Sequence, residues 1–221
     1  MKAREFKTAS EQIAFDVNHR KTIDFNIGRY DKAVSAGMAR YKNVEFAKDR
    51  AAAIKREVLN NWEKYLIEFE ENCRHNGTEV LWAKDDTEAT QHIIRILKEN
   101  RATLLVKSKS MTTEEIELNH TAESVGCESI ETDLGEFIVQ VAGERPYHIV
   151  TPAMHKSKKD IAVLFHEKFG TPLNSTPEEL TEYVRVLLRK KYTSADIGVT
   201  GANRSEDTRL NSSHVSESRM P

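Results

Sequence analysis

Two short clusters of polar side chains each follow an apolar stretch with the length of a buried strand. Residues 107–110, Lys-Ser-Lys-Ser, follow Thr-Leu-Leu-Val, and residues 131–136, Glu-Thr-Asp-Leu-Gly-Glu, follow Cys-Glu-Ser-Ile. A helical pattern begins after each cluster. In an open parallel α/β sheet the loops after the strands gather along one edge, and ligands bind in the crevice there. The two clusters therefore predict a ligand site at that edge.

Lys107 and Lys109 are candidates for binding an anion, together with Ser110. Lysines beside free backbone N–H groups at a helix start suit a carboxylate or a phosphate, and the alternating serines can also donate hydrogen bonds. The alternative is that both lysines are solvated in a surface loop.

Glu131 is the acidic residue of the second cluster that has no local explanation. Asp133 and Glu136 are accounted for as the N-cap and the third residue of a helix, whereas Glu131 ends an apolar strand. A glutamate there could act as a base, a nucleophile or a metal ligand. We take Glu131 and Asp133 as the catalytic candidates. The alternative for Glu131 is that it holds a lysine of the neighbouring loop.

Three residues from later loops complete the candidate site. His155 follows a predicted strand at 148–150 and is a candidate ligand contact. Gly201 and Asn203 follow a predicted strand at 196–199. Glycine lets the backbone approach a ligand closely, and the asparagine side chain can bind a carboxylate or a hydroxyl group.

Strands and helices must alternate from about residue 78 to position these groups. The predicted strands are 79–83, 103–106, 128–131, 148–150 and 196–199, and the predicted helix caps are Asp85, Thr112, Asp133, Ser157 and Thr176. Strand followed by helix, repeated, implies parallel strands joined by right-handed crossovers. We expect residues 77–203 to form an α/β domain, a Rossmann-like three-layer parallel sheet.

Residues 1–76 are predicted to be helical. Thr8 and Glu11 have the spacing of a capping box, and residues 43–75 contain no proline or glycine and keep apolar residues at a helical spacing. Asn76 and Gly77 end this long helix in the prediction, because glycine tolerates the left-handed conformation.

Residues 204–221 resemble the translation of a DNA-sequencing adapter rather than a protein segment. We expect this tail to be non-native and disordered, and the chain to be a fragment of a longer protein. The alternative is a genuine serine-rich terminus.

Composition excludes several classes of function. The net charge of −2 does not favour nucleic acid as a partner, and no apolar run approaches the length of a membrane span. The first residues lack the apolar stretch of a signal peptide. Cys73 and Cys127 lie far apart and form no Cys-x-x-Cys pair, so we expect no metal site or cofactor in this chain, and a reducing cytoplasmic location. The nucleotide-binding glycine motifs are absent.

Four segments together resemble the LUD domain family, in its lactate utilisation protein B group: 107–116, 131–138, 148–156 and 195–203. The resemblance implies a truncated LUD domain, similar in fold to the NagB/RpiA/CoA-transferase-like group. It implies a part in the oxidation of L-lactate to pyruvate, with a small carboxylate as substrate and companion lactate-utilisation subunits as partners. It also implies [4Fe-4S] clusters and electron transfer for the full-length protein, from a cysteine-containing C-terminal part.

Two other functions remain open at this point. One is a stand-alone enzyme of the CoA-transferase or isomerase type that uses Glu131. The other is a non-catalytic docking module whose N-terminal helix binds companion subunits. In the leading interpretation the fragment itself is expected to be inactive.

Overall fold

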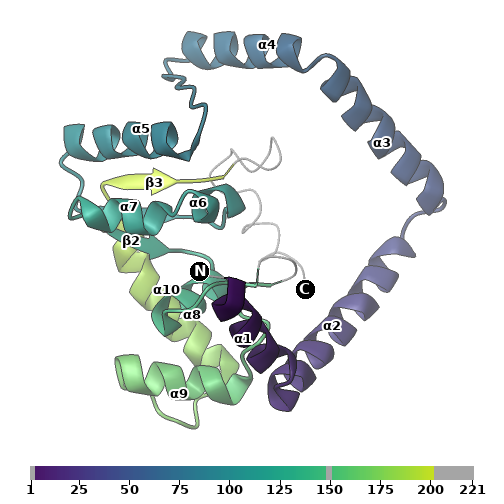
Figure 1. Ribbon diagram of the computed structural model, residues 1–221, viewed down its shortest axis with the longest axis vertical. Coiled ribbons are helices and arrows are strands. Elements are labelled where there is room, and N and C mark those ends of the chain that lie inside the picture. The colour runs from purple at the N-terminus through teal and green to yellow at the C-terminus, as the bar shows by residue number, and fades with distance from the viewer. Residues whose placement is uncertain (1–2, 148–150, 202–221) are drawn as a thin grey trace. The chain divides into compact units, whose positions relative to one another are not determined.

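The computed structural model describes residues 3–147 and 151–201, which form ten helices and three strands (Figure 1). Contacts divide the chain into two compact units. One unit runs from Ile23 to Trp82, and the other combines the residues up to Thr22 with those from Ala83 on. In the described part of the chain, no helix is both long and apolar enough to cross a membrane.

The unit from Ile23 to Trp82 consists of helices. It contains most of α2 (Val17–Met38), α3 (Val44–Asn60) and α4 (Trp62–His75). The side chain of Asn43 caps α3 by accepting a hydrogen bond from the Phe46 backbone N–H. As predicted, α4 is followed by Gly77, which has a positive φ of 79°.

The single helix predicted over residues 43–75 is wrong, because the helix is interrupted at Asn61. This residue has φ −126° and ψ 24°, outside the helical region. Its side-chain amide donates to the Glu57 carbonyl at 3.0 Å. Asparagine side chains compete with the backbone for such hydrogen bonds, which is why asparagine favours helix ends over helix interiors. Apolar periodicity alone did not reveal this break.

None of α2, α3 and α4 contains a buried residue. Their large apolar side chains are exposed instead. On α3 and α4 these are Phe46, Ile54, Val58, Leu59, Trp62, Ile67 and Phe69. Helices of globular proteins are stabilised mainly by burying an apolar face. The apolar side chains of α3 and α4 are therefore available to a partner surface.

The second unit contains an open parallel sheet, which confirms the predicted α/β class. Its strands are β1 (Leu104–Lys107), β2 (Glu128–Glu131) and β3 (Ile197–Val199), in the order β2-β1-β3. The register places Lys107 opposite both Glu131 and Val199. Because all three strands point the same way, the residues that follow them meet at one edge.

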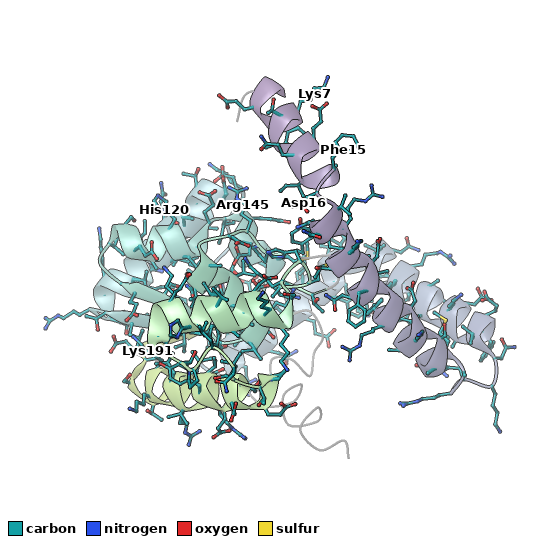
Figure 2. The ribbon with its side chains drawn as sticks, turned by 90° about the horizontal axis from the view of Figure 1, so that it is seen from below. Lys7, Phe15, Asp16, His120, Arg145 and Lys191 are labelled. Atoms are coloured by element: carbon teal, nitrogen blue, oxygen red, sulfur yellow. The ribbon has the colours of Figure 1, made fainter. Side chains whose placement is uncertain are left out.

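Helices cover both faces of the sheet (Figure 1). One face carries α5 (Asp86–Glu99), α6 (Met111–Glu115) and α7 (Leu118–Ser124). The buried apolar cluster on this face comprises Leu97, Leu105, Ala122 and Cys127. The other face carries α8 (Leu134–Ala142), α9 (Lys158–Phe169) and α10 (Pro177–Ser194). Their cluster comprises Phe137, Ile138, Ala162, Phe165, Leu180, Val184 and Leu188. Lys191 at the end of α10, labelled in Figure 2, is paired with Glu128.

The outer edge of β2 is covered by one side chain. Gln140 of α8 accepts a hydrogen bond from the Glu131 backbone N–H at 3.0 Å and donates to the Ser129 carbonyl at 2.7 Å. Its amide thus occupies the positions that the peptide groups of a neighbouring strand would take.

Local capping signals predicted several helix starts correctly. Asp85, Asp133, Ser157 and Thr176 cap their helices through side-chain hydrogen bonds. Ser110, and not Thr112, caps α6, so this prediction was two residues late.

Two predictions near the N-terminus and before the sheet are wrong. Thr8 and Glu11 lie inside α1 (Ala3–Ala14) and so cannot form a capping box at its start. Residues 79–83 form no strand, although Val80, Leu81 and Trp82 make a short apolar run. A strand requires a hydrogen-bonded neighbour, and the three-stranded sheet leaves this segment without one. The predicted strand 148–150 lies outside the described residues.

The first helices belong to the α/β unit only up to Thr22. Phe15 and Asp16, labelled in Figure 2, connect α1 to α2. The Asp16 carboxylate accepts hydrogen bonds from the backbone N–H groups of Asn18 and His19 and so caps α2. This cap places His19 at the first turn of α2.

Candidate functional site

The loops after the three strands meet at the carboxyl edge of the sheet. A Cβ added to Gly201 would lie 2.6 Å from Ser110 Oγ, so the backbone after β3 runs directly against the loop after β1. A Cβ on Gly135 would lie 3.2 Å from Pro152 Cδ, which places the loop around Pro152 against the start of α8. The segments singled out in the sequence are therefore neighbours in space.

Lys107 is an ion-paired buried lysine rather than an exposed one. Its side chain is 1% exposed, and its Nζ lies 2.6 Å from Glu131 Oε1 and 2.7 Å from Glu114 Oε1. Burial lowers the pKa of Lys107, but hydrogen bonds to Glu114 and Glu131 outweigh it, so the pKa lies above its ordinary value. The ammonium is engaged by two protein carboxylates, which is the alternative that the sequence left open for Glu131.

Glu131 is held in place by a second set of contacts. The Asn119 side-chain amide donates to Glu131 Oε1 at 3.0 Å, and the Ser129 hydroxyl donates to Asn119 Oδ1 at 2.8 Å. Burial raises the pKa of Glu131, although Lys107 and Asn119 counteract it. The single positive charge of Lys107 faces the carboxylates of both Glu131 and Glu114. The lysine charge is therefore neutralised, whereas the carboxylates lack a second cation. Glu131 Oε2 is buried and has no hydrogen-bond partner in the described part of the chain.

Glu136 adds a further carboxyl group to this region. It is 3% exposed, and burial, followed by the charges of Glu131 and Glu114, raises its pKa to about 7. Lys109 and Lys107 act in the opposite direction. A carboxyl group with this pKa exchanges its proton near neutral pH, as a general acid or base must.

Three further candidates, Lys109, Ser110 and Asp133, are less buried than Lys107 and Glu131. Lys109 is exposed, and Ser110 is half-buried and accepts a hydrogen bond from the Thr113 N–H. Asp133 accepts hydrogen bonds from the Gly135 and Glu136 N–H groups, so its carboxylate is used to cap α8. Asn203 lies outside the described residues. Catalytic and binding roles for these residues stay predictions.

His155 lies in a separate polar cluster, here called the second cluster, which comprises His19, Glu144, Tyr147, His155 and Lys156. Its Nε2 lies 2.6 Å from Glu144 Oε2, and Lys156 pairs with the other oxygen of Glu144. The Tyr147 ring lies 4.7 Å from the His155 ring, measured between centroids, and the Tyr147 hydroxyl lies 2.8 Å from His19 Nε2. This cluster joins the loop after α8 to the start of α2.

Sequence reasoning missed residues that complete both clusters. Glu114, Asn119, Glu144, Tyr147 and His19 were not singled out, and Glu136 was explained only as a helix-start residue. Nothing in the sequence indicated that His19 would contact Tyr147, 128 positions away.

The residues of this chain do not fit a [4Fe-4S] cluster. Such a cluster needs four ligands, normally cysteine thiolates, and the sequence has two cysteines. Burial raises the pKa of the Cys127 thiol, which opposes the thiolate form that binds iron. Among the described residues no group of three or more His, Cys, Asp or Glu is placed to hold a metal ion.

Comparison with known proteins connects this geometry to a family. The LUD domain model matches residues 66–205. Lactate utilization protein B of Bacillus cytotoxicus is 44% identical over 161 residues, covering 73% of this chain and 34% of that protein. The protein of the same name from Bacillus pumilus is 42% identical over 175 residues, covering 79% of this chain and 37% of that protein.

The chain thus spans about a third of the length of the curated relatives that it matches. No solved structure matches it significantly. The LUD match covers β1, β2 and β3, both polar clusters apart from His19, and all of the candidate residues predicted from the sequence. This chain belongs to the LUD domain family.

Proposed function

We propose that this chain acts in lactate utilisation, as the LUD-domain part of a protein of the B type. Relatives that carry this name are 42–44% identical over most of the chain. The single structural observation behind the proposal is the meeting of three post-strand loops above a buried charged network. That is where ligands bind in open α/β sheets.

The ligand that we propose for this edge is a small carboxylate. Lys109 is exposed and makes no ion pair within the described residues, in contrast to Lys107. The Ser110 hydroxyl accepts from Thr113 and keeps its own proton for donation. Lys109 and Ser110 can therefore supply a charge and a hydrogen bond to a carboxylate.

The finer parts of the proposal rest on the family resemblance. They are oxidation of L-lactate to pyruvate, [4Fe-4S] clusters that transfer electrons, and companion lactate-utilisation subunits. Because this chain has too few cysteines for a cluster, we assign the clusters to the part of the relatives that it does not match. In this scheme the LUD part binds the acid, and electrons leave through other segments.

Growth on lactate tests the role. A Bacillus strain that lacks lactate utilization protein B is complemented with a chimera in which residues 66–205 of this chain replace the matching segment. We expect growth on L-lactate, and a several-fold slower growth rate when Lys109→Ala is introduced. The matched control is Lys98→Ala, an exposed lysine on α5 within the same segment. A chimera that folds and accumulates but never supports growth would contradict the role.

The exposed apolar side chains of α3 and α4 favour a second candidate, docking of a companion subunit. Leu59 is 73% exposed and Trp62 is 64% exposed, at the junction of the two helices. Replacing both with glutamine should abolish co-purification with companion subunits, whereas Lys55→Gln on α3 should not. The Glu131 carboxylate is ion-paired with Lys107 and accepts a hydrogen bond from Asn119, which argues against its use as the nucleophile of an enzyme of CoA-transferase type.

A further inference from the structure

His155 has one ring nitrogen in use and one without a partner. Its side chain is 9% exposed, and Nε2 is engaged by the Glu144 carboxylate at 2.6 Å. Nδ1 is buried and has no hydrogen-bond partner in the part of the chain that the structure describes. A buried polar atom without a partner is rare and costs free energy, because it has lost its bonds to water.

The contact with Glu144 determines which nitrogen carries the proton. A carboxylate only accepts hydrogen bonds, so His155 donates through Nε2–H. In the neutral ring Nδ1 is then an acceptor. Burial raises the pKa of Glu144, but hydrogen bonds from Lys156 and His155 outweigh it, and the pKa lies below its ordinary value. Glu144 therefore remains a carboxylate at neutral pH and keeps the ring in this tautomer.

Two further rings enclose the imidazole. Tyr147 lies 4.7 Å from His155 and His19 lies 5.9 Å from it, measured between ring centroids. The Tyr147 hydroxyl and His19 Nε2 are hydrogen-bonded to each other at 2.8 Å, so neither of these two atoms is directed to His155 Nδ1. The Tyr147 backbone N–H donates to the Pro152 carbonyl, which fixes the loop that carries His155.

This cluster belongs to the same edge of the sheet as the strand loops. Pro152, three residues before His155, would meet a Cβ on Gly135 at 3.2 Å, beside the Asp133 cap of α8. A ligand at the carboxyl edge can therefore approach the loop that holds His155. What Nδ1 requires from such a ligand is one hydrogen-bond donor.

We propose that His155 is an acid–base group whose Nδ1 binds the hydroxyl group of a 2-hydroxy carboxylate, with Glu144 as the positioning residue. The proposal rests on the proposed function for the choice of a hydroxy acid. The ligand O–H donates to Nδ1, and when its proton is transferred the O–H bond breaks, an Nδ1–H bond forms and the ligand becomes an alkoxide. Glu144 balances the charge of the resulting imidazolium.

The test uses the whole chain, labelled with ¹⁵N in its histidine rings and assigned with His155→Gln. In the free chain at pH 7.5 we expect Nε2 protonated and Nδ1 unprotonated. Sodium L-lactate should move the Nδ1 resonance, whereas sodium propionate, the same acid without the hydroxyl, should not. Lactate should also bind about tenfold more tightly or better, because propionate leaves the buried acceptor unpaired.

Glu144→Gln is the informative variant, with Glu128→Gln as its matched control. Both residues are partly exposed glutamates that pair with a lysine, Lys156 and Lys191 respectively. Glu144→Gln should remove the single tautomer and the preference for lactate, and Glu128→Gln should change neither.

Three results would overturn the inference. One is a protonated Nδ1 in the free chain. Another is lactate binding that depends on Lys109 but leaves the His155 resonances unchanged, which spares the proposed function. The third is that neither acid shifts any resonance, which would contradict both the inference and the proposed binding of a small carboxylate.

Discussion

The α/β unit contains two polar clusters, one around Lys107 and one around His155, and their charges are arranged in opposite ways. In the first, one ammonium, Lys107, is shared by the carboxylates of Glu131 and Glu114. In the second, one carboxylate, Glu144, is shared by His155 and Lys156. The first cluster carries one negative charge in excess, whereas the charges of Glu144 and Lys156 balance while the His155 ring is neutral. The pKa of Glu131 is therefore raised by burial that its partners do not offset, whereas that of Glu144 is lowered by partners that offset its burial.

Exposure separates the two clusters further. Lys107 and Glu131 are 1% and 2% exposed, whereas the Glu144 side chain is 40% exposed. Ion pairs removed from water lose much more when one partner is deleted than pairs near water do. The first cluster should consequently determine stability, and the ion pairs of the second should contribute little to it.

Removing the shared ammonium should have the largest effect. Lys107→Met leaves Glu131 buried without its cation and should lower the free energy of unfolding by about 3–5 kcal/mol. Chemical denaturation at pH 7, followed by circular dichroism, measures it. Lys109→Met, at an exposed lysine two residues on, is the control and should change stability by less than about 0.5 kcal/mol. Adding Glu131→Gln to Lys107→Met should recover part of the loss; equal losses in the single and double variants would show that the charge is not the cause.

Neutralising Glu136 should stabilise the protein in a pH-dependent way. Its pKa is about 7 in the folded chain against 4.5 in the unfolded reference, so the unfolded state loses the proton first. Stability associated with this group is present below pH 4.5 and is lost as the pH rises to 7. Because a tenfold change in proton affinity corresponds to about 1.4 kcal/mol, Glu136→Gln should stabilise the protein by about 3 kcal/mol at pH 8.

At pH 5 the same gain should shrink to under about 1 kcal/mol. Glu136 is then protonated in nearly all folded molecules and in a substantial fraction of unfolded ones, so the two states differ little in protonation. Denaturation curves at the two pH values measure the difference. Glu123→Gln on α7 is exposed and serves as the control. A gain that is equal at pH 5 and pH 8 would mean that Glu136 titrates normally.

Packing of the loops above the first cluster can be tested at Gly201. Gly201→Ala would place a Cβ 2.6 Å from Ser110 Oγ and 2.7 Å from Ser110 Cβ. We expect a loss of about 1–3 kcal/mol from this overpacking. Gly198→Ala is the matched control, since nothing lies within 4 Å of its added Cβ. Ser110→Gly should relieve the clash in the double variant, and its failure to do so would place the strain elsewhere.

The smallest effect is expected in the second cluster. Glu144→Gln should lower stability by no more than about 1 kcal/mol at pH 7, because the carboxylate is largely screened by water. Its pKa is lowered in the folded state, so the contribution exists above the unfolded pKa and disappears as the pH falls through the folded one. Denaturation at pH 7 and at acidic pH checks this, and a loss approaching that of Lys107→Met would erase the distinction between the clusters.

Much of the sheet and of the helix starts could be predicted from the sequence because their causes are local. The strand that ends at Lys107 is a short apolar run, and the caps at Asp133, Ser157 and Thr176 each involve residues within three positions. The strand expected at 79–83 depended on a neighbour that the fold does not supply. The break at Asn61 came from a side chain that competes with the helix, a signal that apolar spacing does not contain.

The sequence predicted where the site lies, but it did not predict which side chains contact one another there. Parallel strands alone imply that the loops holding Ser110 and Gly201 meet. The pairing of Lys107 with Glu131 requires the register of β1 against β2, and that register is fixed by packing across the whole sheet. His19 reaches Tyr147 only because the first turn of α2 belongs to the α/β unit. Contacts of this kind, between residues far apart in sequence, leave no mark on local patterns.

The amide of Gln140 makes the two margins of this small sheet unequal. An incoming extended peptide that tried to lengthen the sheet beside β2 would find the Glu131 N–H and the Ser129 carbonyl already occupied. In the described part of the chain, β3 has no comparable blocking group and only β1 beside it. Strand addition, whether by a binding peptide or by an aggregating copy, should therefore start at Ile197–Val199.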